Sequence, residues 1–218
     1  MSIWSSKGAK ILSWSERRLN QMHFWKKTEI NLILLRLQCV PNVGLYLSIG
    51  WNKRFLFISA PCMSNCIDIL ARDVVAFHFC QLDNEPSCTI PEFVHNLAAQ
   101  LSRCPNLTNY RTLLSQNSEL LSTVTYRNCL ENPTRALVKG ILEPLAMLRS
   151  QGKISGQRSL ILVDSLCDAE YHRTDSGETL ASFLGSHLQF FPRWLRIICT
   201  VRSNMIDIMK PYPFHRLR

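Results

Sequence analysis

Three short apolar runs constrain the fold of this chain more than any other feature. They read DVVAFHFC (73–80), SLILVD (159–164) and RIICTV (196–201), with helical sequence between them. Strands that are apolar on both faces and alternate with helices are typical of a parallel sheet covered by helices. We therefore predict an α/β fold with a parallel sheet and flanking helices. A further run, RFLFIS (54–59), predicts one more strand.

Proline positions and apolar spacing predict the helices between these strands. Pro91 opens a helix whose apolar residues recur at three- and four-residue steps as far as Leu101. Pro133 opens another helix, and Pro144 should kink it or reset its start because proline cannot donate the backbone hydrogen bond of a helix interior. The other predicted helices cover residues 107–116, 119–125, 179–190 and 204–209.

The basic charge of the chain is concentrated in its first quarter. The 218 residues carry 25 Lys and Arg against 16 Asp and Glu, a formal net charge of +9. Residues 1–54 account for +7 of that charge and for four of the five tryptophans, whereas residues 55–218 account for only +2. We expect a basic, tryptophan-rich arm over 1–53 and a separate domain over 54–218. Charge of this kind suits nucleic acid or an anionic membrane.

The cysteines and the polarity of the first residues predict a cytoplasmic protein. There are nine cysteines, an odd number, and no secretory signal precedes them, so reduced thiols are expected. Cys62, Cys66, His78 and Cys80 lack the spacing of a four-ligand zinc site. The longest early uncharged stretch, 37–52, has 16 residues, fewer than the ~20 of a spanning helix, and predicts no transmembrane segment. A weaker alternative for the start is an organellar presequence or an interfacial helix.

Charged residues close two of the predicted strands at the edge where α/β folds place their chemistry. Asp164 ends the run SLILVD, Asp168 and Glu170 follow it, and Arg202 follows RIICTV. One carboxylate at a strand end can hold a metal through water, a second can orient an attacking water, and a guanidinium can bind a γ-phosphate. The alternatives are a helix cap or turn for Asp164, and an ion pair with one of the carboxylates for Arg202.

Longer phrases are distributed collinearly over about residues 71–218. They include DVVAFHFCQLDNEPSCTIPEFVHNLAAQL, GILEPLAMLRSQGKI, LILVDSLCDAEYHRTDSGETLASFL and FPRWLRIICTVRSN. Together they resemble the NTPase-like domain of the TANC family of scaffold proteins (tetratricopeptide, ankyrin-repeat and coiled-coil; rolling pebbles-like). The resemblance implies a partial STAND-type P-loop NTPase fold. It also implies a cytoplasmic parent protein at the postsynaptic density or cell cortex, with synaptic scaffold partners and a part in spine regulation.

The resemblance assigns roles to three of the charged residues. Asp164 matches the Walker B aspartate, which would hold Mg²⁺, and Arg202 matches a sensor-like arginine. The family phrase at 164–170 reads like D-G-L-N-E-A-E, so Asp168 stands in place of an acid that is one methylene longer. Its shorter reach weakens a catalytic role as base or water-positioning group. ATP or GTP with Mg²⁺ would be the cofactor of an intact family domain.

The phosphate-binding loop departs from the family pattern. No glycines are spaced as G-x-G-x-x-G or G-x-x-x-x-G-K-[ST]. The one candidate loop begins at Ser59, contains no glycine, and has Asn65 for lysine and Cys66 for threonine. It lacks the charge and the backbone freedom that cradle phosphates. Residues 1–70 are therefore either a degenerate loop with its arm or unrelated sequence. The family chain also continues past PFHR, so a fragment or truncated product is expected.

Two main hypotheses follow for the function. The first is a protein-interaction module of a TANC-like scaffold that keeps the Walker B half and does not hydrolyse nucleotide. The second is an ATP- or GTP-binding signalling switch with a degenerate phosphate loop. A weaker third is membrane or nucleic-acid binding through residues 1–54; no RNA-binding motif is present, and we expect no nucleic-acid partner. A sheet without its first βα unit exposes its edges, so self-association is expected.

Overall fold

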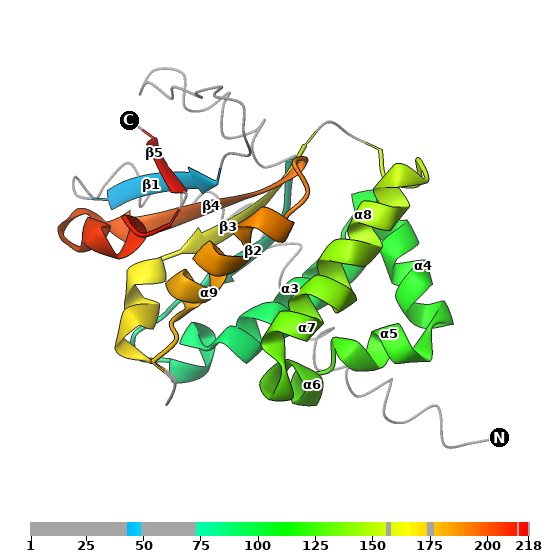
Figure 1. Cartoon of the computed structure of the whole chain (residues 1–218), viewed down its shortest axis with the longest axis horizontal. Helices are drawn as coiled ribbons and strands as arrows, with labels where there is room; N and C mark the ends of the chain where they lie inside the picture. The colour runs from blue at the N-terminus through cyan, green and yellow to red at the C-terminus, as the bar shows by residue number, and fades with distance from the viewer. Residues whose placement is uncertain (1–42, 49–72, 156–157, 174–176, 213, 218) are drawn as a thin grey trace. The chain divides into compact units, whose positions relative to one another are not determined.

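The computed structural model describes residues 43–48, 73–155, 158–173, 177–212 and 214–217 (Figure 1). The chain divides into two compact units, Met1–Pro41 and Asn42–Arg218, and the described residues all belong to the second. The predicted strand at 54–59 and the candidate loop residues Ser59, Asn65 and Cys66 lie outside the described residues, as does most of the predicted arm.

The sheet contains the three parallel strands that the apolar runs predict. β2 (Val74–Phe79), β3 (Ser159–Asp164) and β4 (Leu195–Arg202) lie side by side and run in the same direction. Two further strands are antiparallel: β1 (Val43–Ser48) pairs with β4, and β5 (Phe214–Leu217) pairs with β1. The order is β2-β3-β4-β1-β5, so the prediction of a parallel sheet is correct for its first three strands and wrong for the sheet as a whole.

Helices connect the parallel strands. Between β2 and β3 the chain forms η2 (Glu85–Cys88), α3 (Ile90–Arg103), η3 (Pro105–Leu107), α4 (Thr108–Gln116), α5 (Ser118–Thr123), α6 (Tyr126–Glu131), α7 (Pro133–Leu137), the π-helical turn η4 (Val138–Leu142) and α8 (Glu143–Ser150). Between β3 and β4 it forms η5 (Leu166–Tyr171), α9 (Leu180–His187) and η6 (Leu188–Phe190), and η7 (Ser203–Met209) follows β4. The helix expected at 204–209 is thus a 3₁₀ helix, and α6 was not predicted.

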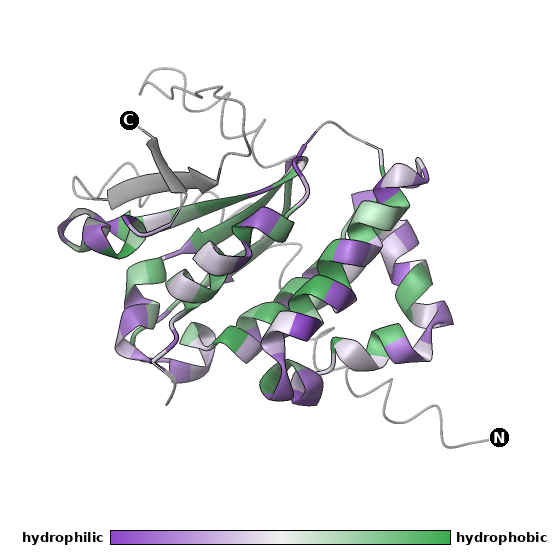
Figure 2. Ribbon diagram, viewed as in Figure 1, coloured by the Kyte–Doolittle hydropathy of each residue, from purple (hydrophilic) through white to green (hydrophobic). Residues whose placement is uncertain are grey.

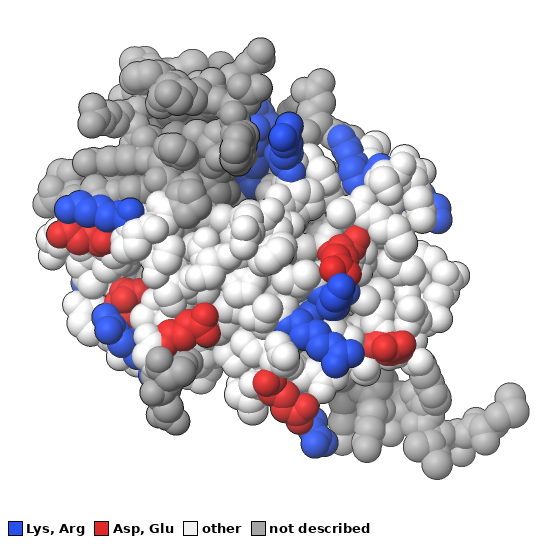
Figure 3. All heavy atoms as spheres, in the orientation of Figure 1, with Lys and Arg blue, Asp and Glu red and all other residues white. Residues whose placement is uncertain are grey.

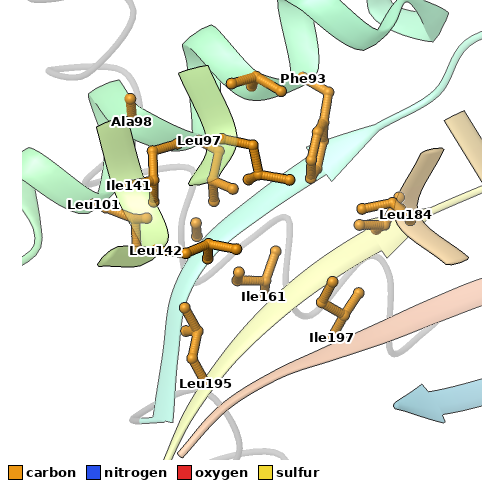
Figure 4. Packing of buried hydrophobic residues seen from close by; sticks show 14 of the residues in the cluster. Phe93, Leu97, Ala98, Leu101, Ile141, Leu142, Ile161, Leu184, Leu195 and Ile197 are labelled. Atoms are coloured by element: carbon orange, nitrogen blue, oxygen red, sulfur yellow. The ribbon is translucent and has the colours of Figure 1, made fainter. Parts of the chain in front are cut away.

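The main hydrophobic core lies between the helices and one face of the parallel strands. The apolar residues of α3 that recur at helical spacing are buried, as predicted, and they include Phe93, Leu97 and Leu101. Figure 4 shows these side chains and those of η4 facing Ile161 of β3 and Ile197 of β4. Figure 2 shows the same arrangement as apolar helix faces turned toward apolar strands. Burial of each large apolar side chain contributes about 1.5–3 kcal/mol relative to exposure.

The free edge of β2 is closed by a side chain of α3. β2 is the first strand in the order of the sheet, so one side of its backbone has no neighbouring strand among the described residues. The side chain of Gln100 accepts a hydrogen bond from the Phe77 N–H at 3.0 Å and donates to the Phe77 carbonyl oxygen at 2.7 Å. Both backbone groups of Phe77 are thereby satisfied at the edge, where unpaired groups invite association with other chains.

Pro144, where a kink or a new helix start was expected, lies in the first turn of α8, directly after the π-helical turn η4. Proline has no N–H to donate to the carbonyl four residues earlier, which here is Gly140. The hydroxyl of Tyr110, on α4, donates to that carbonyl oxygen at 2.8 Å. A Cβ at Gly140 would lie 2.5 Å from the side chain of Val124, so glycine permits the close approach of this turn to the end of α5. A tertiary hydrogen bond therefore replaces the helical hydrogen bond that Pro144 cannot donate to Gly140.

Acidic and basic side chains lie near one another on the face of the molecule shown in Figure 3, several as adjacent pairs. Two such pairs, Arg127–Glu131 and Lys139–Glu143, are exposed ion pairs one helical turn apart. Pairs of this kind contribute only about 0.3–0.5 kcal/mol each. Within the described residues, no helix combines the length and the apolar character needed to cross a bilayer.

Candidate functional site

The candidate site begins where β3 ends, at Asp164. The carboxylate is buried, and the hydroxyl of Thr200 on β4 donates to its Oδ1 at 2.6 Å. The same hydroxyl oxygen accepts the Ser165 N–H at 2.8 Å. The pairing of Val163 with Cys199 places Asp164 and Thr200 level with each other on adjacent strands. Thr200 therefore links the ends of β3 and β4 through both the side chain and the backbone that follows it.

A left-handed residue turns the chain out of β3. Ser165 has φ 55° and ψ 42°, and it is the one non-glycine residue with positive φ among those that the structure describes. This conformation is costly for residues with a Cβ and is concentrated at functional or tightly constrained sites. The Ser165 carbonyl oxygen accepts the Asp168 N–H at 2.8 Å. The turn thereby brings Asp168, on η5, back toward the strand ends.

Asp168 and Arg202 form an ion pair across the end of the sheet. The guanidinium Nη2 donates to Asp168 Oδ1 at 2.8 Å, and the side chain of Asp168 is 10% exposed against 51% for Arg202. The neighbouring Cys167 thiol lies 3.8 Å from the same oxygen, and burial raises the pKa of that thiol. The arginine thus covers a nearly buried carboxylate while its own outer side faces solvent.

Glu170 lies at the other end of η5. Its Oε2 is 3.4 Å from Arg173 Nη2, in an exposed pair, while its Oε1 is buried and has no hydrogen-bond partner among the described residues. The next residue but one, His172, contacts the carbonyl oxygen of Leu82 through Nε2 at 2.9 Å. The η5 segment therefore joins the end of β3 to the loop that follows β2.

The structure brings together three of the residues that the sequence singles out: Asp164, Asp168 and Arg202. The ion pair offered as the alternative role of Arg202 is present, with Asp168 as its partner. Asp164 is not a helix cap: the residue before η5 is Ser165, and no side-chain cap is formed there. Ser59, Asn65 and Cys66 lie outside the described residues.

Thr200 is the site residue that the sequence analysis missed. It stands two residues before Arg202 in CTVR, so the period of two along a strand places both side chains on the same face of β4. That spacing was available in the sequence, but a threonine in a strand carries no signal of its own because threonine is common in strands.

The described residues do not form a complete metal site. A divalent cation held by protein groups needs several converging oxygen or nitrogen ligands. No cluster of three or more His, Cys, Asp or Glu side chains suited to a metal ion occurs among the described residues. Asp164 Oδ1 already accepts from Thr200, and Asp168 is paired with Arg202.

A separate small cavity of about 130 Å³ lies between α5, α6 and α7. Its lining is largely polar and contains none of the residues of the candidate site; it consists of Glu119, Ser122, Thr123, Asn128, Glu131, Asn132, Arg135 and Ala136. Asn132 Oδ1 accepts the Arg135 N–H there as the cap of α7. These polar groups serve the helix ends that meet at the cavity.

No protein-family model matches the chain, and no solved structure matches it significantly.

Proposed function

We propose that the domain is a protein-interaction module of a TANC-like scaffold, with a STAND-type NTPase-like fold that does not hydrolyse nucleotide. Three parallel strands with intervening helices support the relationship, as do Asp164 at the end of β3 and Arg202 at the end of β4. The left-handed Ser165 is further support, because it stands where the family phrase has glycine, the residue that adopts this conformation most readily.

The Asp168–Arg202 ion pair is the observation that carries the non-hydrolytic part of the proposal. A water-orienting carboxylate and a phosphate-binding arginine would both have to leave this 2.8 Å contact before acting. Separation would leave Asp168, whose side chain is only 10% exposed, without its charged partner. Loss of one partner from such a site is costly because the remaining charge stays desolvated. The pair is therefore proposed as a structural link between η5 and β4.

The groups that would bind Mg²⁺ and nucleotide do not fit that role here. Asp164 is hydrogen-bonded by Thr200, Asp168 is paired with Arg202, and the described residues contain no cluster of three or more His, Cys, Asp or Glu side chains suited to a cation. In the sequence, the candidate phosphate loop has Asn65 and Cys66 where lysine and threonine would be needed. No hydrolytic step is therefore derived for this chain.

A double-mutant cycle on Asp168 and Arg202 tests the structural role. We expect Arg202→Ala and Asp168→Ala each to lower the free energy of unfolding, with a coupling of about 0.5–1.5 kcal/mol, reduced by the solvent that screens Arg202. Urea denaturation followed by circular dichroism measures each variant. The same cycle on the exposed pair Lys139–Glu143, whose atoms are 2.7 Å apart, is the matched control and should give about 0.3–0.5 kcal/mol.

Nucleotide binding and nucleotide hydrolysis are tested by two separate measurements, and we expect neither. We expect no change in the melting temperature of the full chain with slowly hydrolysed ATP or GTP analogues and Mg²⁺ at millimolar concentration. A rise in melting temperature that disappears in Asp164→Asn would overturn the proposal. Phosphate release above the background of the Asp164→Asn variant would do the same.

The alternative function is an ATP- or GTP-binding signalling switch with a degenerate phosphate loop. It is favoured by one observation, the buried Glu170 Oε1 that lacks a hydrogen-bond partner among the described residues close to the end of β3. An unsatisfied buried carboxylate oxygen costs free energy that a bound group could recover. The nucleotide titration decides between the two functions, since only the switch predicts stabilisation that depends on Asp164.

The family resemblance supplies the proposed context of the module. We propose synaptic scaffold proteins as partners and a cytoplasmic location at the postsynaptic density or cell cortex. Self-association is proposed as well, and light scattering coupled to size-exclusion chromatography tests it. A monomer at all concentrations up to about 100 µM, a range in which weak dimers of micromolar Kd form, would contradict self-association.

A further inference from the structure

Two thiols lie together beneath the loop that follows β2. Cys80 directly follows β2. Cys88 is the last residue of η2 and comes eight residues after Cys80. The Cys88 thiol donates to the carbonyl oxygen of Gln81, the residue after Cys80, each thiol shifts the pKa of the other, and both are free in the structure. Their side chains are buried, whereas residues 81–86, in the loop between them, are all exposed.

The loop is ordered around Cys88 by a compact set of hydrogen bonds. The Cys88 thiol lies 3.4 Å from the carbonyl oxygen of Gln81 and 3.8 Å from the Ser87 hydroxyl. The Ser87 hydroxyl oxygen in turn accepts the Gln81 N–H at 2.9 Å, and it donates to the Asn84 carbonyl oxygen at 2.6 Å. These contacts hold Cys88 beside the backbone that directly follows Cys80.

The electrostatic surroundings favour the thiolate of Cys88. The neighbouring Cys80 thiol is the main cause that lowers the pKa of Cys88 to about 6; burial opposes the shift, and the charge of His172 favours it. The thiolate is the nucleophilic form of cysteine, so one member of the pair is suited to attack and the other lies ready to resolve the product.

We propose that Cys80 and Cys88 form an oxidisable dithiol, which hydrogen peroxide converts into an intramolecular disulfide. The Cys88 thiolate attacks one peroxide oxygen, the O–O bond breaks, and hydroxide leaves, giving the sulfenic acid of Cys88. The Cys80 sulfur then attacks the Cys88 sulfur, the S–O bond breaks, and the departing hydroxide takes the Cys80 proton as water. Both sulfurs are oxidised; the hydroxide of the first step takes a proton from solvent, so one peroxide is reduced to two molecules of water in total.

The disulfide would act on a loop that contacts the candidate site. Leu82, within the loop, accepts a hydrogen bond at its carbonyl from His172 of the segment that carries Asp168. The Cys80 N–H donates to the Asp164 carbonyl oxygen at 3.1 Å. Oxidation would therefore tie the loop to the end of β2 beside Asp164, whether or not the site binds a nucleotide.

Peptide mapping of the full chain tests the proposal directly. Trypsin releases residues 73–103 as one peptide, and Cys80 and Cys88 are its only cysteines. The reduced protein is exposed to hydrogen peroxide while folded, denatured, alkylated and digested. We expect this peptide to appear unalkylated and lighter by two hydrogen atoms, and to become doubly alkylated when it is reduced first. Peptides that carry Cys129 and Cys199 should remain singly alkylated under the same conditions.

Single variants assign the two roles. In Cys80→Ser, Cys88 should stop at the sulfenic acid, which dimedone traps, and in Cys88→Ser the thiol of Cys80 should stay reduced. Circular dichroism establishes that each variant is folded, and the wild-type mapping stands without them. The proposal is overturned if the wild-type peptide remains doubly alkylated at peroxide concentrations that oxidise Cys129 or Cys199. It is also overturned if Cys80 or Cys88 pairs mainly with another cysteine of the chain.

Discussion

Removal of the Tyr110 hydroxyl should lower the free energy of unfolding, because this hydroxyl stabilises the helix that Pro144 interrupts. The hydroxyl donates to the Gly140 carbonyl oxygen at 2.8 Å, and the side chain is fully buried. Burial also raises the pKa of Tyr110, so the hydroxyl stays a protonated donor at neutral pH. Tyr110→Phe keeps the ring and its packing. The substitution therefore isolates one hydrogen bond to a carbonyl that Pro144 cannot serve.

The expected loss of stability in Tyr110→Phe is that of a single buried hydrogen bond. A typical hydrogen bond contributes about 1 kcal/mol net, and a buried acceptor that loses its donor adds part of its desolvation penalty, so we expect about 1–2 kcal/mol. For a domain of this size, each kcal/mol corresponds to about 2–4 °C in melting temperature, which predicts a decrease of about 2–8 °C. Tyr126→Phe is the matched control, because its ring is 45% exposed, and it should change stability by less than about 0.5 kcal/mol.

A second background tests the proposed reason for the cost. In Pro144→Ala the residue at 144 regains an N–H that can donate to Gly140, so Tyr110→Phe should cost about half as much or less there. Urea denaturation of the four proteins, followed by circular dichroism, measures the cycle. An equal cost of Tyr110→Phe in both backgrounds, or none in either, would refute the role assigned to Pro144.

Three further predictions concern other contacts. Burial lowers the pKa of His78 to about 4 from 6.5, so the free energy of unfolding should fall as pH drops through 6.5 toward 4, by about 2 kcal/mol between pH 7 and 5; in His78→Gln this part of the pH dependence should vanish, and parallel curves would contradict it. Thr200→Val should cost about 2–3 kcal/mol in urea denaturation because Asp164 loses its 2.6 Å donor, while Thr200→Ser should cost about 1 kcal/mol or less. A Cβ at Gly185 would lie 2.1 Å from the Tyr212 ring, so Gly185→Ala should destabilise by about 1–3 kcal/mol; in a Tyr212→Ala background the change should instead stabilise by up to about 1 kcal/mol, and a cost of the same size in both backgrounds would rule out the clash.

The parallel part of the fold was predictable because it depends on local composition. DVVAFHFC, SLILVD and RIICTV are apolar on both faces, and this pattern requires burial on both sides of a strand. The amphipathic spacing in α3 is equally local, and the structure buries the expected residues. The strand β1 was missed because VGLYLS lies in an uncharged stretch that was tested only as a possible membrane span, and its antiparallel pairing with β4 depends on residues distant in the sequence.

The candidate site was predictable in its residues and not in its pairings. A charged residue at the end of each buried strand places Asp164 and Arg202 at one edge of the sheet, since the carboxyl ends of parallel strands coincide. The choice of Asp168 as the partner of Arg202 depends on the left-handed turn at Ser165, which sends η5 back toward β4. Thr200 was missed because its role arises only from the register between β3 and β4.

The sequence by itself determined the three buried strands, the amphipathic helices between them and the charged residues at the strand ends. Each of these follows from the side-chain pattern over a few neighbouring residues. Only the tertiary structure decided the antiparallel extension of the sheet, the pairing of Asp168 with Arg202, the support of Gly140 by Tyr110 and the contact between Cys80 and Cys88. Apart from the cysteine pair, these contacts join residues 30 or more positions apart, and even Cys80 and Cys88 meet only through the fold of their loop. A local sequence pattern does not specify which distant groups will come into contact.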